Sequence, residues 1–180
     1  MKQSRSLIIV FIALILFSAF IRVGLYPYTF SPIIALALFG GSVIQDKKFS
    51  FALPLLAMFL SDILFEIFNV ADGFWGLEQV GGYAIFAIIT LLGTNIKKIT
   101  VLNVAGYSVA SSLIFFFLSN SNVWIFDRGY YARSFSGYID CLYKGLPFLT
   151  NGLAADLFYS ALFFGGYVFV RKYATHKSVA

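Results

Sequence analysis

A single carboxylate lies inside an otherwise apolar stretch near the carboxyl end of the chain. The stretch runs from Thr150 to Val170, about the length of one membrane-spanning helix, and contains Asp156. An ionisable side chain at this depth in a bilayer costs about 2.5–3.5 kcal/mol on insertion scales, so it normally faces a partner or a wet cavity. We therefore expect Asp156 to face other polar groups inside a helical bundle.

The rest of the chain has the composition of an integral membrane protein. Of its 180 residues, 60% are hydrophobic and 12% are charged, and the mean hydropathy is +0.86. These values exclude a disordered chain and disfavour a soluble domain. Because one spanning helix takes about 20 residues, six helices nearly exhaust the length. The expected fold class is an all-α integral membrane protein, a six-helix transmembrane bundle in one domain over residues 1–180.

Apolar runs give the expected spans, at about 7–23, 31–45, 49–69, 80–96, 101–119 and 150–170. The first run follows Lys2 and Arg5 and could be a signal peptide, but Ser18-Ala19-Phe20 is a poor cleavage site, which favours a first membrane helix. The second run is short and contains Gly40-Gly41. A helix this short spans only where the bilayer thins, or it is partly re-entrant.

The longest connection, residues 119–149, contains a further helical pattern. Between Ser134 and Pro147 the apolar residues recur at helical spacing, and Asp140 and Lys144 can pair on the opposite face. This pattern predicts a short amphipathic helix in the long outer loop, lying on the membrane or capping a cavity.

The basic residues predict the orientation of the bundle. With the amino terminus inside, the inner segments hold nine Lys and Arg residues, whereas the outer segments hold four. This excess predicts that both termini are cytoplasmic. Topology therefore explains the net charge of +5 better than a nucleic-acid partner does, and the partner expected for these segments is the lipid bilayer.

On this topology the intramembrane polar side chains gather on the outer side, and the inner halves of the spans hold no charged residue. An ion channel or proton path needs polar groups through the full thickness of the membrane. The one-sided distribution instead favours a site that captures a small molecule from outside. The candidate binding residues are Arg22, Tyr28, Phe30, Asp62, Glu66, Asn120, Asn122, Trp124, Asn151 and Asp156.

Two interpretations of this polar cluster stay open. Arg22 could neutralise Asp62 or Asp156 as a structural ion pair that holds the helices in register. Alternatively, the cluster forms a pocket for a flat organic ligand, walled by aromatic side chains of the outer loops. We expect no catalytic residue, metal site or cofactor, because the chain has one cysteine, one histidine and no hydrolase or phosphate-binding motif.

Several short motifs resemble a family of small bacterial inner-membrane proteins. They are Phe30-Ser31-Pro32, Ala35 to Gly41, Pro54 to Met58, Ser61-Asp62, Ser119 to Trp124, Cys141 to Tyr143, Pro147-Phe148 and Asn151 to Tyr159. That family is similar to the substrate-binding (S) components of energy-coupling-factor (ECF) vitamin transporters and to the solitary cobalamin transporters related to them. The resemblance implies a bacterial inner-membrane location, six helices, and a ligand site near the outer surface, built from helix ends and the loops after spans one, three and five.

The chain departs from those transporters at two positions. S components that dock a shared energising module carry an Ala-xxx-Ala pattern in span one, whereas here Ala13 is followed four positions later by Phe17. This departure argues against docking of an energising transporter module, which stays an open question among the partners. The solitary transporters use a cysteine to ligand cobalt, and the only cysteine here, Cys141, lies in the long outer loop, where it could reach a ligand or simply pack.

The expected function is binding and uptake of a small vitamin-like molecule from the outer side, without catalysis. One alternative is a structural or assembly membrane protein whose polar cluster only locks helix packing. A minor alternative is an intramembrane aspartyl enzyme. Phe68 to Asp72 resembles the second aspartate motif of bacterial lipoprotein signal peptidases, but Asp156 is followed by Leu157 instead of arginine, and the order of the motifs is reversed.

Overall fold

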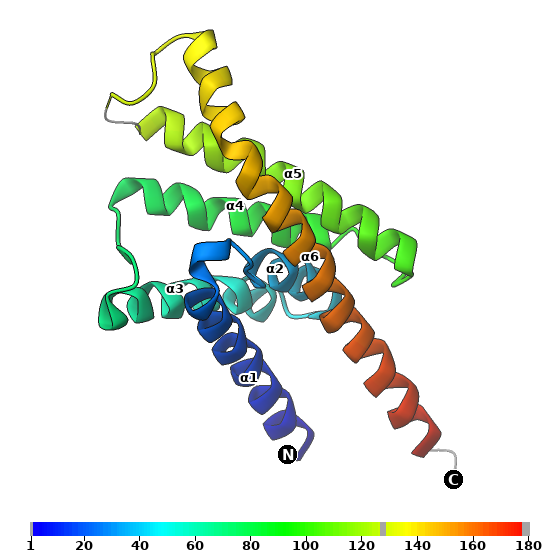
Figure 1. The fold of residues 1–180 in the computed structure, drawn as a ribbon. Helices are drawn as coiled ribbons and strands as arrows, with labels where there is room; N and C mark the ends of the chain where they lie inside the picture. Colours follow the sequence, from blue (N-terminus) through cyan, green and yellow to red (C-terminus); the bar gives the residue numbers. More distant parts are fainter. Residues whose placement is uncertain (1, 127–128, 178–180) are drawn as a thin grey trace.

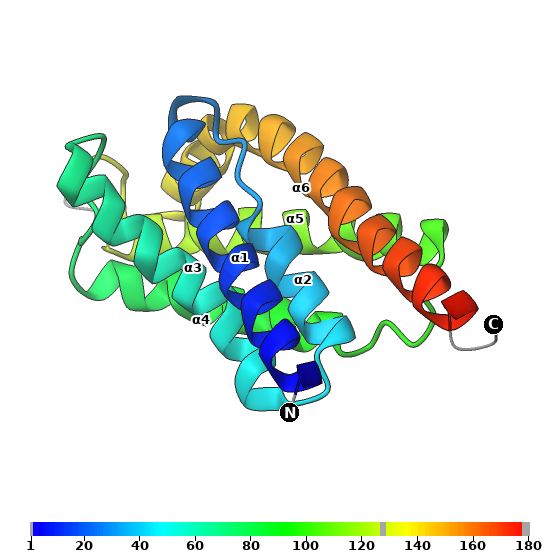
Figure 2. The ribbon, with the colours of Figure 1, turned by 90° about the horizontal axis from the view of Figure 1, so that it is seen from below.

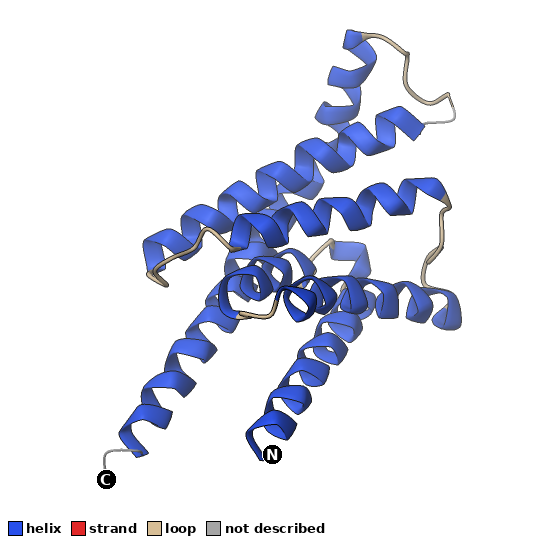
Figure 3. Cartoon of the chain, turned by 180° about the vertical axis from the view of Figure 1, so that it is seen from behind, coloured by secondary structure: helices blue, strands red, loops and turns tan. Residues whose placement is uncertain are grey.

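Helices and their short connections make up all of the chain that the computed structural model describes, residues 2–126 and 129–177. Figure 3 shows helices and loops, without strands, over these residues. The expected all-α fold is confirmed to this extent. The elements are α1 (Lys2–Gly24), the 3-10 helix η1 (Tyr26–Tyr28), α2 (Ile33–Val43), α3 (Lys47–Phe68), α4 (Leu77–Gly93), α5 (Val101–Phe126) and α6 (Phe135–Lys177) (Figure 1).

Three of the described helices are long and apolar enough to cross a membrane. They cover Lys47–Phe68, Val101–Phe126 and Phe135–Lys172. The described part of α1 from Ile8, together with α2 and α4, forms shorter apolar helices. Each of the six predicted apolar runs is therefore helical, although length and composition alone mark only three of them as spans.

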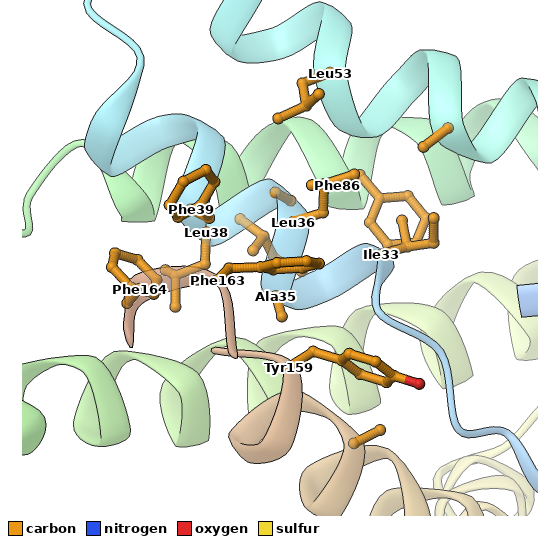
Figure 4. Packing of buried hydrophobic residues seen from close by; sticks show 14 of the residues in the cluster. Ile33, Ala35, Leu36, Leu38, Phe39, Leu53, Phe86, Tyr159, Phe163 and Phe164 are labelled. Carbon is orange, nitrogen blue, oxygen red and sulfur yellow. The ribbon is translucent and has the colours of Figure 1, made fainter. Parts of the chain in front are cut away.

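The short helix α2 lies at the centre of the fold and packs against all five other α-helices. Eight of its residues are buried, including Ile33, Leu36 and Leu38. Figure 4 shows these side chains against Leu53 of α3 and against aromatic side chains of α4 and α6. Because every face of α2 is covered by protein, its apolar side chains need no lipid, and a helix of only 11 residues is sufficient.

Glycines allow α2 and α4 to touch backbone to backbone. A Cβ atom on Gly41 of α2 would overlap the carbonyl oxygen of Thr90, and one on Gly93 of α4 would overlap the carbonyl oxygen of Leu38. Close approach of this kind is typical of helix packing in membranes, where small residues let backbones meet. On the other side of α2, the Ser50 hydroxyl of α3 donates a hydrogen bond of 3.0 Å to the Gly40 carbonyl.

Successive helices alternate in direction, so the connections fall at two ends of the bundle. In Figure 1 the α3–α4 and α5–α6 connections lie at the left, and the α4–α5 connection lies at the right. The carboxyl end of α1, the amino ends of α2 and α4 and the carboxyl ends of α3 and α5 consequently meet at one end of the fold. The polar residues predicted to lie on the outer side belong to these helix ends.

The prediction of a separate amphipathic helix between Ser134 and Pro147 is wrong, because α6 runs without interruption from Phe135 to Lys177. Pro147 lies inside this helix, which follows a curved path in Figure 2. Before the proline, α6 already buries Gly137, Cys141 and Gly145 at a spacing of four residues, as a helix packed along α5 does. This packing on both sides of the proline outweighs the hydrogen bond that a proline removes.

The expected long connection of residues 119–149 differs from the structure in its extent. The expected Asp140–Lys144 pair is confirmed, with a distance of 2.8 Å between Lys144 Nζ and Asp140 Oδ2. In addition, α5 continues to Phe126, beyond the expected end of span five at residue 119. The long connection of residues 119–149 is therefore mostly helical, as an extension of α5 and the first turns of α6.

The backbone contact between α2 and α4 gives the first prediction. Gly41→Ala should lower the free energy of unfolding by about 1–3 kcal/mol, because the added methyl group must separate the two helices. The matched control is Gly165→Ala on α6, where a Cβ meets nothing within 4 Å. Thermal and denaturant unfolding of the purified protein in mild detergent would measure both. Equal stability of the two variants would contradict the backbone contact.

Candidate functional site

A cavity of about 310 Å³ lies beside the amino-terminal end of α2. Its volume is at the lower end of the range for small-molecule pockets, about 300–1,000 Å³. The wall is largely apolar, with Ile33 and Ile34 of α2 on one side. The aromatic residues of the wall are Tyr26, Phe30, Trp75, Phe86, Phe115, Phe116 and Phe148.

Asp156 is the carboxylate of this cavity wall and is 1% exposed. Its Oδ2 atom lies 2.6 Å from the Ser112 hydroxyl of α5, which can donate to it. Its Oδ1 atom has no hydrogen-bond partner among the described residues, nor is any lysine or arginine of that part of the chain paired with it. A buried carboxylate oxygen without a donor is costly, so this atom is the least satisfied polar group of the site.

Arg22, at the last turn of α1, also lies in the cavity wall, but its charge is already matched. Its Nη1 atom donates to Asp62 Oδ1 of α3 at 2.6 Å and also to the Ser61 hydroxyl. The guanidinium carbon lies 4.6 Å from the centre of the Phe65 ring, in a cation–π contact. The ion pair therefore connects α1 to α3, and these two helices pack closely along their length.

Asp62 is fully buried behind Arg22 and does not itself line the cavity. Besides Arg22, two groups of α4 donate to its Oδ2 atom: Gln79 Nε2 and the Tyr83 hydroxyl, each at 2.7 Å. Gln79 also donates to the Gly73 carbonyl at 3.0 Å and so fastens the α3–α4 connection. With donors on both oxygens, Asp62 has the surroundings of a structural carboxylate.

The two predicted asparagines of α5 line the cavity, and each donates a hydrogen bond to a backbone carbonyl. Asn122 Nδ2 donates to the Glu78 carbonyl of α4 at 2.8 Å, and Gly81 leaves the room for its side chain. Asn120 Nδ2 donates to the Phe116 carbonyl of its own helix at 2.7 Å. The buried Cys141 of α6 packs against Asn120, with its Sγ atom 3.5 Å from the Asn120 carbonyl oxygen, and it does not line the cavity.

The connection from α1 to α2 forms another part of the wall. It contains η1 and then Thr29, whose φ of 52° lies in the left-handed region. A β-branched residue rarely adopts this conformation, and such strain persists only where the surroundings enforce it. Thr29 and Phe30 both line the cavity, so the strained turn forms part of its wall.

The structure thus brings together Arg22, Phe30, Asn120, Asn122 and Asp156 around one cavity and places Asp62 directly behind Arg22. The remaining four predicted binding residues lie outside the wall: two of them hold the connections between helices, and the other two are exposed. Tyr28 is 66% exposed. Glu66 accepts hydrogen bonds from the backbone N–H groups of Gly73 and Phe74, at 2.9 and 3.3 Å, and orders the α3–α4 connection.

Trp124 and Asn151 complete this group. The Trp124 indole donates to the Ala132 carbonyl at 3.1 Å, and the Arg133 guanidinium lies over its ring, so Trp124 joins the two ends of the α5–α6 connection. Asn151 is exposed on α6. Its neighbour Gly152 is the residue that reaches the cavity.

The Arg22–Asp62 pair that the sequence offered is present, but sequence reasoning missed the other donors: Ser112 for Asp156, and Gln79 and Tyr83 for Asp62. Gln79 and Tyr83 are four residues apart in an apolar helix, so they share one face, and this spacing is a signal that could have found them. Ser112 offers no such signal, because several serines occur along α5 and serine is common where membrane helices pack.

The buried ion pair gives the second prediction. Asp62→Asn should cost about 3 kcal/mol of stability, because it leaves a partly buried guanidinium without its counter-charge, and adding Arg22→Gln should restore part of the loss. Asp140→Asn, which breaks the exposed pair with Lys144, is the control and should change stability little. Denaturant unfolding of the wild type and these three variants would measure these values. An Asp62→Asn loss no larger than that of the control would contradict a stabilising pair.

Comparison with known proteins gives one match. Neither a curated protein nor a solved structure matches the chain. A family model described as "Family of unknown function (DUF6580)" matches residues 2–178, which is nearly the whole chain. The protein therefore belongs to the DUF6580 family.

Proposed function

We propose that this protein binds a small organic molecule in the cavity beside α2 and takes it up across the membrane. The observation that carries the proposal is a mostly apolar cavity of ligand size whose wall contains a buried carboxylate oxygen without a donor. Cavities that serve only packing are small and dry, whereas ligand pockets combine apolar walls with a few well-placed polar groups. Asp156 is such a polar group.

The proposal includes a six-span arrangement in a bacterial inner membrane with both termini in the cytoplasm. The excess of lysine and arginine at the end opposite the cavity supports this orientation. In that orientation the cavity lies in the outer half of the bundle, near the α1–α2 connection. The helix α2 then need not span by itself, because the surrounding helices shield it from lipid.

The ligand class that we propose is vitamin-like, in keeping with the motifs that resemble S components of ECF transporters. The position of the cavity supports this likeness, because the cavity lies at helix ends, beside the connections that follow α1 and α3 and near the carboxyl end of α5. It has the volume for a molecule of one or two rings, and aromatic side chains suited to stacking line it. An energising module and solitary transport remain alternative sources of energy within this proposal.

The structural alternative has an observation of its own in the Arg22–Asp62 pair, in which both carboxylate oxygens of Asp62 accept hydrogen bonds. That pair ties three helices together and needs no ligand. It does not extend to Asp156, which has neither an ion pair nor a second donor among the described residues. The aspartyl-enzyme alternative would need Asp72 and Asp156 at one site, but Asp72 is exposed in the α3–α4 connection and does not line the cavity, so we do not favour it.

Filling the cavity tests the proposal. Gly152 lines the cavity, and a Cβ added there meets nothing within 4 Å, so Gly152→Leu should occupy part of the space without straining the helix. Gly165→Leu adds the same side chain to the same helix, at an exposed position away from the cavity, and is the matched control. We expect mass spectrometry of protein purified in mild detergent to find a small molecule enriched with wild type and Gly165→Leu, and absent with Gly152→Leu.

Two results would contradict the proposed function. The first is that wild type and Gly152→Leu carry the same small molecules. The second is that neither carries any, although both are folded and were purified without washing out weak ligands. Under the structural alternative, either result is expected.

Labelling from the two sides of the membrane tests the arrangement. In a Cys141→Ser background, a cysteine at Asp72 in the α3–α4 connection should react with an impermeant maleimide added to spheroplasts. A cysteine at Lys98 in the α4–α5 connection should react only after the membrane is opened. Both positions are exposed, so access depends on the side of the membrane alone. Reaction of both cysteines from the same side would contradict the six-span arrangement.

A further inference from the structure

We propose that the cavity selects an organic cation, a molecule of one or two rings whose protonated nitrogen binds Asp156. This inference rests on the proposed function, because it names the ligand class of the same cavity. It is carried by the balance of charge and of hydrogen-bonding groups around the cavity.

The cavity wall contains two charged side chains, Arg22 and Asp156. Arg22 is paired with Asp62 at 2.6 Å, so this pair adds no net charge to the site. Asp156 is then the uncompensated charge of the wall when it is ionised. Burying a carboxylate without a counter-charge is expensive, and a cationic ligand supplies the missing charge.

The hydrogen-bonding geometry favours the same kind of ligand. Asp156 Oδ2 lies 2.6 Å from the Ser112 hydroxyl, which leaves the buried Oδ1 as the carboxylate oxygen that still needs a donor. An ionised carboxylate oxygen only accepts hydrogen bonds, and an N–H group that carries positive charge forms the strongest bond with it. A protonated amine or ring nitrogen supplies both the hydrogen-bond donor and the positive charge in one contact.

The aromatic wall adds a second attraction for a cation. Tyr26, Phe30 and Trp75 line the cavity from the α1–α2 and α3–α4 connections, and Phe115 and Phe116 line it from α5. The faces of aromatic rings carry partial negative charge and attract cations, more strongly where water is excluded. The same rings also offer stacking surfaces to the planar part of a ligand.

An anionic ligand fits this site poorly. It would bring a second negative charge close to Asp156, and the positive charge of Arg22 in the wall is already balanced by Asp62. A neutral hydroxyl could donate to Asp156 Oδ1, but it would leave the buried charge uncompensated. The expected order of affinity for ligands of one shape is therefore cation, then neutral, then anion.

Three probes of nearly the same shape test this order: 1-naphthylmethylammonium, 1-naphthylmethanol and 1-naphthoate. Calorimetric titration of the full-length protein in lipid nanodiscs would measure each affinity, with Gly152→Leu as the blank for partition into lipid. We expect the cation to bind wild type at least about tenfold more tightly than the alcohol, and the anion to bind weakest. Asp156→Asn should remove the preference for the cation and keep the binding of the alcohol.

The outcomes separate this inference from the proposed function. If the three probes bind wild type with equal affinity, or if the order of affinity is reversed, the inference is overturned. This result needs no variant, so it holds even if Asp156→Asn does not fold. Failure of the cation to bind wild type up to its solubility limit would overturn it as well. A folded Asp156→Asn protein that still prefers the cation would also overturn the inference, because the preference would then come from other groups. In each case, a small molecule that co-purifies with wild type but not with Gly152→Leu would leave the proposed function standing.

Discussion

The ion pair between Arg22 and Asp62 decides how charge is distributed in the polar part of the bundle. A buried pair is tolerated only when further hydrogen bonds satisfy its atoms, and here Gln79 and Tyr83 complete the surroundings of Asp62. The pair therefore joins α1, α3 and α4 at the end of the fold where the cavity lies. Because Arg22, the positive charge of the cavity wall, is paired with Asp62, the Asp156 carboxylate has Ser112 as its only hydrogen-bond partner among the described residues.

The cavity itself follows from the length of α2. At 1.5 Å per residue, its 11 residues reach about 16 Å, roughly half of the 30 Å hydrocarbon thickness of a bilayer. The glycine contacts with α4 and the Ser50 hydrogen bond fix α2 close to the opposite end of the bundle. Its longer neighbours continue past its first residue, Ile33. The α1–α2 connection and the cavity lie beyond that residue, between these longer neighbours.

Much of this could be predicted from the sequence, and the remainder depended on which helices are neighbours. Apolar runs identified the six described α-helices, because a helix needs apolar side chains whether it is buried in protein or in contact with lipid. Pro147 suggested an end to a helix that continues, since a local rule cannot weigh the packing of Cys141 and Gly145 along α5. The sequence offered Arg22 two carboxylate partners, and only the packing of α1 on α3 selects Asp62. The serine beside Asp156 could not be distinguished from the other serines of α5.

The structural and the ligand-binding interpretations of the polar cluster consequently apply to different residues. Asp62 has the donors that a structural carboxylate requires, whereas Asp156, in the wall of a cavity of ligand size, has an oxygen without a donor. Arg22 belongs to both settings, because its guanidinium lines the cavity while it holds Asp62. Loss of function after a change at Arg22 would therefore not distinguish the two interpretations. Asp156 and Gly152 can distinguish them, since neither takes part in the ion pair that holds the helices together.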